Sequence, residues 1–210
     1  MWDTFSPLGR GGCQATVKNA HSAELLPGGL VAVAASDNAA GGGDHIALFD
    51  RGRSDRVIQS VPLAAAHGVV WDAKRNVLWA LGETQLLRLQ LMNDSNTAHL
   101  EIDKGIDLPG PIGHDLQISK SCDVLWVTTT KAVFSVDPDR LSFVPFAPFH
   151  NLSGIKSLSI EEGTGQIAYT QADPRVCGTY TLRFKTPDEQ INLGSMIYKV
   201  RWSSSGQEER

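Results

Sequence analysis

Five basic side chains recur along the chain at nearly constant spacing. They are His21, His67, His114, Lys156 and Lys199, and successive members are 46, 47, 42 and 43 residues apart. Each lies near the start of a short run of alternating apolar residues. Three imidazoles brought together would form a site for zinc, manganese, iron or copper, with positions left open for substrate or water. The two lysines would add positive charge, which suits an anionic substrate.

A histidine at such a position also has a structural interpretation. Its ring can donate or accept a hydrogen bond from neighbouring backbone or hydroxyl groups and so fix the loops between repeats. Equivalent positions along the chain are expected under both interpretations. The change from histidine to lysine in the last two units favours a site, because a purely structural bond would keep one residue type. Both interpretations stay open at the level of sequence.

Two carboxylates accompany the basic residues. Glu24 lies three residues after His21, and Asp115 directly follows His114. Adjacent residues of a strand point to opposite faces, so Asp115 is expected behind the site or between repeats, and not as a co-ligand. Lys156 is the best candidate for a base or an electrostatic stabiliser, because burial and neighbouring positive charge lower the pKa of a lysine.

The sequence therefore predicts a set of metal ligands and a set of catalytic groups. Lys199 is expected to bind a carboxylate or phosphate. No nucleotide cofactor is expected, because the glycine-rich stretch GGGD at 41–44 lacks the Lys-Ser/Thr of a phosphate-binding loop. The predicted metal ligands are His21, His67 and His114, and the predicted catalytic residues are Lys156, Lys199, Glu24 and Asp115.

The spacing of the basic residues also indicates the architecture. A period of about 40–47 residues is typical of propeller blades or of paired-helix repeats. Each unit contains four short runs rich in β-branched and aromatic residues and separated by turn signals, which favours strands. Four strands per period make one propeller blade. In the second unit, for example, the runs are GVVWD, VLWALG, QLLRLQL and AHLEI.

Four complete units extend from His21 to Leu193, and a further inner strand, IYKVRW, follows at 197–202. The N-terminal segments WDTFSP and QATVKNA could pair with it. The sequence thus predicts an all-β, five-bladed propeller over residues 1–202, closed by an incomplete blade from both termini, with a disordered tail at 203–210. An incomplete blade leaves an unpaired strand edge, which predicts a partner or self-association.

Several phrases resemble those of an uncharacterised family of small bacterial and fungal β-propellers, within the wider WD40-like and YVTN-like group. The phrases are AHSAELLPGG, AHGVVWD, LWALG, GHDLQ, KSLSI and YKVRW, between Ala20 and Trp202. The resemblance implies the propeller fold and no established reaction. In that family the first blade begins further upstream, with a strand of the VLVLD type that this sequence lacks.

Composition limits the classes of function. The chain has 210 residues, a net charge of -4 and 41% hydrophobic residues, which is typical of a globular protein. This acidic balance argues against nucleic acid or an anionic membrane as partner. The N-terminus lacks the pattern of a secretory signal and no apolar run is long enough to span a membrane, so we expect a cytoplasmic protein with reduced cysteines.

The sequence thus favours a protein that acts on a small, anionic molecule at a channel mouth lined by histidine and lysine. The reaction would be of the lyase, isomerase or hydrolase type, with a divalent transition metal as its cofactor. Propellers with histidine-bound metal occur among pectin-fragment lyases, which makes an acidic sugar one candidate substrate by analogy of fold. The alternative is a non-catalytic interaction scaffold, or a shortened inactive propeller, with structural histidines.

Overall fold

The computed structural model describes residues 17, 19–36, 44–94, 97–173, 176 and 178–202. Within these residues the chain forms four antiparallel sheets of four strands each. The strands are β1 (Ala20–Leu26), β2 (Leu30–Ala35), β3 (His45–Asp50) and β4 (Arg53–Pro62); β5 (Gly68–Asp72), β6 (Val77–Leu81), β7 (Gln85–Asp94) and β8 (Thr97–Asp107); β9 (Gly113–Ile118), β10 (Leu125–Thr129), β11 (Val133–Asp137) and β12 (Ser142–Pro145); β13 (Ile155–Ile160), β14 (Ile167–Gln171), β15 (Thr179–Lys185) and β16 (Glu189–Ile197).

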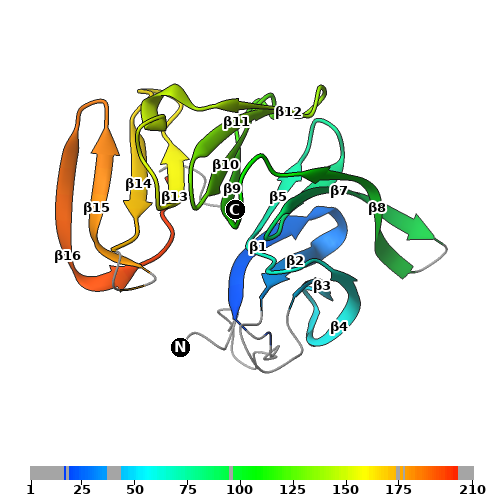
Figure 1. The fold of residues 1–210 in the computed structure, drawn as a ribbon. Helices are drawn as coiled ribbons and strands as arrows, with labels where there is room; N and C mark the ends of the chain where they lie inside the picture. The colour runs from blue at the N-terminus through cyan, green and yellow to red at the C-terminus, as the bar shows by residue number, and fades with distance from the viewer. Residues whose placement is uncertain are drawn as a thin grey trace.

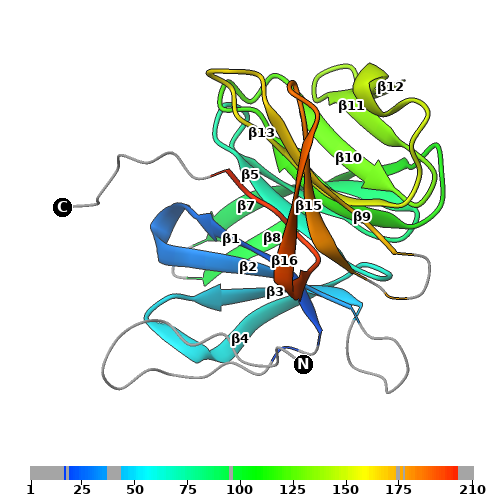
Figure 2. The ribbon, with the colours of Figure 1, turned by 90° about the vertical axis from the view of Figure 1, so that its left-hand side faces the viewer.

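Each sheet is one propeller blade whose strands follow one another in chain order. The innermost strands β1, β5, β9 and β13 contact each other in succession, so the blades fan out around them (Figures 1 and 2). The prediction of an all-β propeller is confirmed. Helix in the described residues is limited to two short 3-10 turns, η1 (Pro27–Gly29) and η2 (Ala147–Phe149). The described part of the chain contains no helix long and apolar enough to cross a membrane.

The number of blades differs from the predicted five. The segment Tyr198–Trp202, expected as the inner strand of a fifth blade, lies beside β13 but takes no place in the sheets of the described residues. Side-chain hydroxyls hold its backbone instead: Val200 N–H donates to Ser157 Oγ at 3.1 Å, and Trp202 N–H donates to Ser159 Oγ at 2.9 Å. Such bonds anchor one segment without starting a new ladder. The segment WDTFSP and most of QATVKNA lie outside the described residues.

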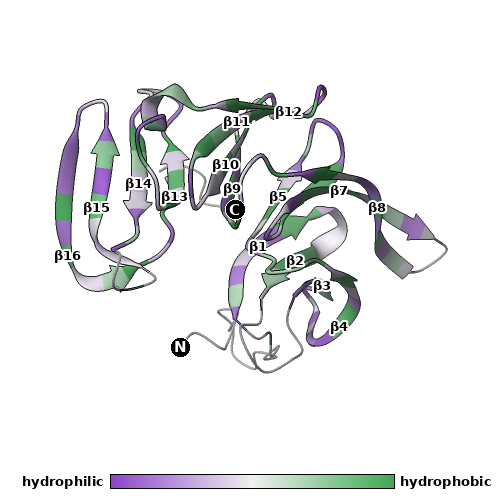
Figure 3. Ribbon diagram, viewed as in Figure 1, coloured by the Kyte–Doolittle hydropathy of each residue, from purple (hydrophilic) through white to green (hydrophobic). Residues whose placement is uncertain are grey.

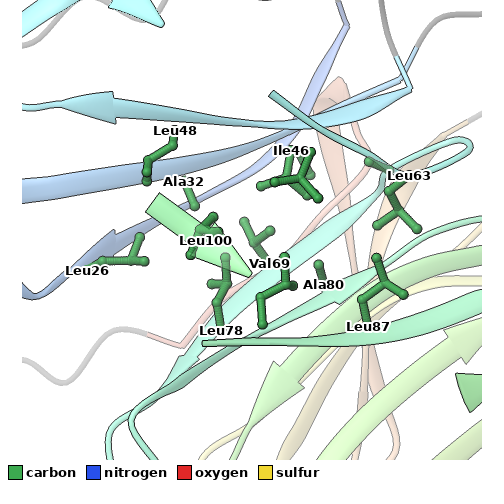
Figure 4. Close-up of a cluster of buried hydrophobic side chains, with 14 of the residues drawn as sticks. Leu26, Ala32, Ile46, Leu48, Leu63, Val69, Leu78, Ala80, Leu87 and Leu100 are labelled. Atoms are coloured by element: carbon green, nitrogen blue, oxygen red, sulfur yellow. The ribbon is translucent and has the colours of Figure 1, made fainter. Parts of the chain in front are cut away.

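The hydrophobic core lies between consecutive blades. The interface between the first two blades buries leucines, valines and alanines from both, including Leu48 and Ile46 of one blade and Leu78 and Val69 of the next (Figure 4). A second cluster joins blades two and three, and a third joins blades three and four. Full burial of one such side chain contributes about 1.5–3 kcal/mol relative to exposure. These interfaces fix the inner strands that position the site.

The turn after β5 ties the second blade to the third. The buried Asp72 carboxylate accepts hydrogen bonds from Trp79 Nε1 at 3.2 Å and from the Arg75 guanidinium at 2.9 Å. The same guanidinium also donates to the Cys122 carbonyl and, through two nitrogens, to the Asp139 carboxylate of the next blade. A guanidinium that bridges two carboxylates in this way restrains the angle between the blades.

Candidate functional site

The basic residues predicted from the repeat converge at the centre of the propeller. His21 lies in β1, His67 directly precedes β5 and His114 lies in β9. The ring centroids of His21 and His67 are 4.1 Å apart, and those of His67 and His114 are 5.9 Å apart. Tyr198 places its ring 5.7 Å from His21, and Lys156 of β13 contacts His114. We call His21, His67, His114, Lys156 and Tyr198 the histidine cluster.

Glycines next to two of the histidines let the inner strands approach this closely. A Cβ atom on Gly68 would lie 2.7 Å from the Cβ of Leu116 in β9. A Cβ atom on Gly113 would lie 2.5 Å from the carbonyl oxygen of Gly82. A side chain at Gly68 would therefore push β5 away from β9, and one at Gly113 would push β9 away from the end of β6. The spacing of the histidine rings depends on these two contacts.

His114 has polar neighbours on both of its ring nitrogens. Lys156 Nζ lies 2.9 Å and Thr130 Oγ1 lies 3.0 Å from its Nε2 atom, and Tyr198 Oη lies 3.4 Å from its Nδ1 atom. A lysine ammonium can only donate, so Nε2 accepts and the proton of the neutral ring is on Nδ1. The ring then donates toward Tyr198. One imidazole thus links groups from β9, β13 and the C-terminal segment.

All three imidazoles of the histidine cluster are harder to protonate than free histidine. Burial, followed by the charge of neighbouring groups, lowers the pKa of His21 and of His114 to about 3. The groups whose charge lowers the pKa of His114 are, in order, Lys156, His67, Lys199 and His21, of which only the two lysines are cationic at neutral pH. The pKa of His67 is lowered as well, chiefly by burial. The rings are therefore uncharged at neutral pH and stand in a positive electrostatic field.

The two lysines have different surroundings. Lys156 lies beside His114, and its ammonium is 6.0 Å from the centre of the Tyr198 ring. Lys199 instead points into the interior, where Nζ donates to the His67 carbonyl at 2.6 Å and forms an ion pair with Asp115 at 3.0 Å. Burial lowers the pKa of Lys199, and the Asp115 carboxylate opposes this effect. Lys156 therefore belongs to the histidine cluster. Lys199 connects the backbone of His67 to the buried Asp115.

Asp115 is the centre of a second, buried group of polar residues. Its side chain is 1% exposed and accepts hydrogen bonds from both terminal nitrogens of Arg201, at 2.8 and 2.7 Å, and from Ser157 Oγ at 2.6 Å. These donors and Lys199 lower the pKa of Asp115 against the effect of burial. We call Asp115, Ser157, Lys199 and Arg201 the Asp115 cluster. It joins β9, β13 and the C-terminal segment.

Glu24 has partners outside the histidine cluster. Burial raises the pKa of this half-buried carboxyl to about 7, while the Arg201 charge and a hydrogen bond from the Trp71 backbone oppose the shift. The Arg201 charge links Glu24 to the Asp115 cluster. The catalytic roles predicted for Glu24, Asp115 and Lys199 stay predictions.

Sequence reasoning missed four side chains that the fold brings to these clusters, and one of them is Ser157 of β13, which donates to Asp115. Tyr198 and Arg201 flank Lys199 within YKVRW, and Thr130 follows the end of β10. The sequence offered a signal for Tyr198 and Arg201, because the residues around Lys199 in a segment beside the channel must also face neighbouring strands. Thr130 had no signal, since its contact with His114 depends on the turn between β10 and β11.

Metal binding by His21, His67 and His114 stays a prediction. The three rings meet, as the repeat predicted. Among the residues that the structure describes, however, no group of three or more histidine, cysteine, aspartate or glutamate side chains is arranged to hold a metal ion. His21 and His67 stack with an angle of 30° between their planes. Shared coordination of one ion would require these rings to turn their nitrogens toward a common point.

The comparisons with known proteins bear on family and fold. A family model described as a family of unknown function, DUF6528, matches residues 11–203. No curated protein matches the chain. Among solved structures, hydrazine synthase of Kuenenia stuttgartiensis is similar with a TM-score of 0.60 and 12% identity, over 89% of this chain and 53% of that one. The β-propeller domain of Myceliophteria thermophila Cps50 (Swd1) is similar with a TM-score of 0.56 and 15% identity, over 82% and 53%.

At these identities the likeness shows the propeller fold and nothing of the chemistry. The chain spans about half the length of the two solved structures, as the 53% coverage of each shows.

Proposed function

Because the chain belongs to DUF6528, a family of unknown function, we propose its function from the site alone: it binds a small anionic molecule at the histidine cluster and acts on it by proton transfer. The observation that carries the proposal is the meeting of three imidazoles, one ammonium and one phenol from five separate segments of the chain. These are groups that hydrogen-bond anions and exchange protons.

The electrostatics of the cluster support an anion as the ligand. Lys156 and Lys199 both lower the pKa of His114, so a positive potential acts on its ring. The Asp115 carboxylate is already engaged by two cations and a hydroxyl. A carboxylate or phosphate at the histidine cluster would reduce the repulsion among the basic groups, as an opposite charge does for any charged site.

The same groups are suited to general acid–base catalysis. An uncharged imidazole can accept a proton, and the Lys156 ammonium beside it can stabilise negative charge that develops on the ligand. This chemistry serves lyase, isomerase and hydrolase reactions alike. A divalent metal on the three imidazoles would polarise the ligand in addition, and it remains part of the proposal to be tested.

The structural interpretation of the histidines is supported at one position. His67 Nδ1–H donates to the Ala65 carbonyl at 2.6 Å, which fixes the turn that leads into β5. No comparable bond to its own turn is given for His21 or His114 in the described structure. We therefore assign the ligand-binding role mainly to His114, Lys156 and Tyr198, with His67 as the residue that holds the turn.

Calorimetric titration with inorganic phosphate and with succinate tests the proposal. The parent should bind at least one of these anions, and Lys156→Met should weaken binding at least tenfold because it removes the ammonium beside His114. Lys104→Met is the matched control, since Lys104 is an exposed residue of the outer strand β8. Absence of anion binding by the parent, or equal loss in both variants, would overturn the proposal. A parallel titration with Zn²⁺ tests the metal.

A further inference from the structure

The outer strands of the four blades differ in how their free edges are protected. The long strand β4 carries Arg53, Asp55 and Arg56, and the long strand β8 carries Glu101, Asp103, Lys104 and Asp107. The strand β12 has only four residues and ends in Pro145. Charges, prolines and short length are the usual devices that prevent an edge strand from pairing with another chain.

β16 has no proline and fewer charges than β4 or β8, and its ladder with β15 is irregular only after Asn192. It has nine residues, EQINLGSMI, and its only charged residue is Glu189 at one end. Ile191 and Met196 are exposed on it, with 51% and 53% of their surface accessible. Figure 3 shows hydrophobic bands alternating with hydrophilic ones along β15 and β16. Of the four outer strands described, β16 is the one most suited to accept another strand.

From this difference we infer that the protein self-associates, with β16 of one copy pairing antiparallel with β16 of a second copy about a two-fold axis. We assign β16 as the pairing strand of the second copy too, because β4, β8 and β12 of that copy are protected. A pair of identical edges closes after two copies and leaves no β16 exposed. The inference is independent of the function proposed for the histidine cluster.

The regular part of β16 sets the register of this pairing. Glu189 to Asn192 pair in sequence with Phe184 to Thr181 of β15, and the register breaks after Asn192. A two-fold axis at Ile191 uses this regular part. It places the two Ile191 side chains opposite each other and sets each Gln190 against Asn192 of the second copy.

This register also separates the charges. The two Glu189 side chains lie at opposite ends of the new pairing, each against Leu193 of the second copy. Apolar pairs and amide pairs across an antiparallel ladder are favourable, whereas like charges directly opposite are not. Leu182 of β15 is paired with Ile191 and extends the apolar contact, because residues paired across strands share a face.

Sedimentation velocity of the full chain over a series of concentrations tests the inference. The parent is expected to form a reversible dimer. Ile191→Lys should weaken dimerisation at least tenfold, because it places a charge in the middle of the free edge. Ile102→Lys is the matched control, since Ile102 is 52% exposed on the outer strand β8 and should leave the dimer unchanged. A parent that stays monomeric throughout, or two lysine variants that behave alike, would overturn the inference.

Crosslinking provides an independent readout that does not depend on disrupting the protein. In the Ile191→Cys variant the two-fold axis brings the introduced thiols together, so mild oxidation should give a disulfide-linked dimer in high yield. The Ile102→Cys variant should stay uncrosslinked under the same conditions. Equal crosslinking of the two variants, or none in the first, would contradict the proposed register.

Discussion

His114 and Asp115 are neighbours in β9, but their side chains enter two different polar clusters. Asp115 is buried, and its charge is matched by Lys199 and Arg201 with well-formed hydrogen bonds. His114 is uncharged, and the Lys156 and Lys199 ammonium groups act on it. A charge-balanced cluster stabilises a structure, whereas a cluster with excess positive potential is suited to a ligand. The two faces of one strand thus separate the support of the site from the site itself.

The largest effect is expected where the charge balance of the Asp115 cluster is broken. Asp115→Asn leaves Lys199 and Arg201 facing a neutral amide in the interior. Breaking a buried ion pair by removing one partner costs about 3–5 kcal/mol of unfolding free energy. Denaturant unfolding measures this loss. Asp123→Asn, which removes an exposed ion pair with Lys74 and alters a hydrogen bond with Ser121, is the control and should shift the unfolding midpoint far less.

The unfolding free energy should depend on pH in the acidic range because of the histidine cluster. His21 and His114 have a pKa of about 3 in the folded protein against 6.5 unfolded, so between these values only the unfolded chain takes up the protons. Unfolding free energy should fall as pH drops through this window, by at most about 1.4 kcal/mol per pH unit for each histidine. Glu24 acts in the opposite direction: its raised pKa means that its contribution is present below pH 4.5 and is lost as pH rises through about 7.

Unfolding measured at several pH values between 6.5 and 4.5 tests this prediction. His114→Gln should flatten the dependence, because it removes one of the histidines that drive it. His150→Gln, at an exposed position outside the cluster, should keep the slope of the parent. A stability that rises on acidification would show that Glu24 outweighs the histidines.

Removing one hydroxyl that contacts each cluster should give a smaller difference in unfolding free energy. Ser157 Oγ donates to Asp115 and accepts from Val200 N–H, so Ser157→Ala should cost about 1.5–3 kcal/mol, as expected for hydrogen bonds to charged groups. Thr130 is exposed and contacts only the rim of the histidine cluster at His114. Thr130→Val should change the unfolding free energy by less than about 0.5 kcal/mol. Equal losses would mean that both clusters are structural.

The repeat made much of the fold predictable. The run Val77–Gly82, for instance, was expected as a strand and forms β6 at Val77–Leu81. Periodicity predicts blades well because each unit carries its own alternation and turn signals. It also placed the three histidines together, since equivalent positions on inner strands meet at the axis of a propeller.

The remaining features depend on contacts between distant segments. Arg201 reaches Asp115 only because serine hydroxyls hold the C-terminal segment beside β13, and no local pattern reports such an anchor. Trp202 is 38% exposed, because it packs at the edge of the last blade against Phe184. The predicted fifth blade is not confirmed within the described residues, which form four blades, because a strand-like sequence does not show whether a partner strand is present.

Histidine-ring NMR during a phosphate titration tests the division between site and support most directly. The chain contains six histidines, so each ring nitrogen can be followed separately. We expect the signals of His114 and His21 to move with phosphate, while those of His45, His99 and His150 stay fixed. Movement confined to the cluster would establish it as an anion site. Signals that all stay fixed, or that all move alike, would contradict the account and leave the histidines with a structural role.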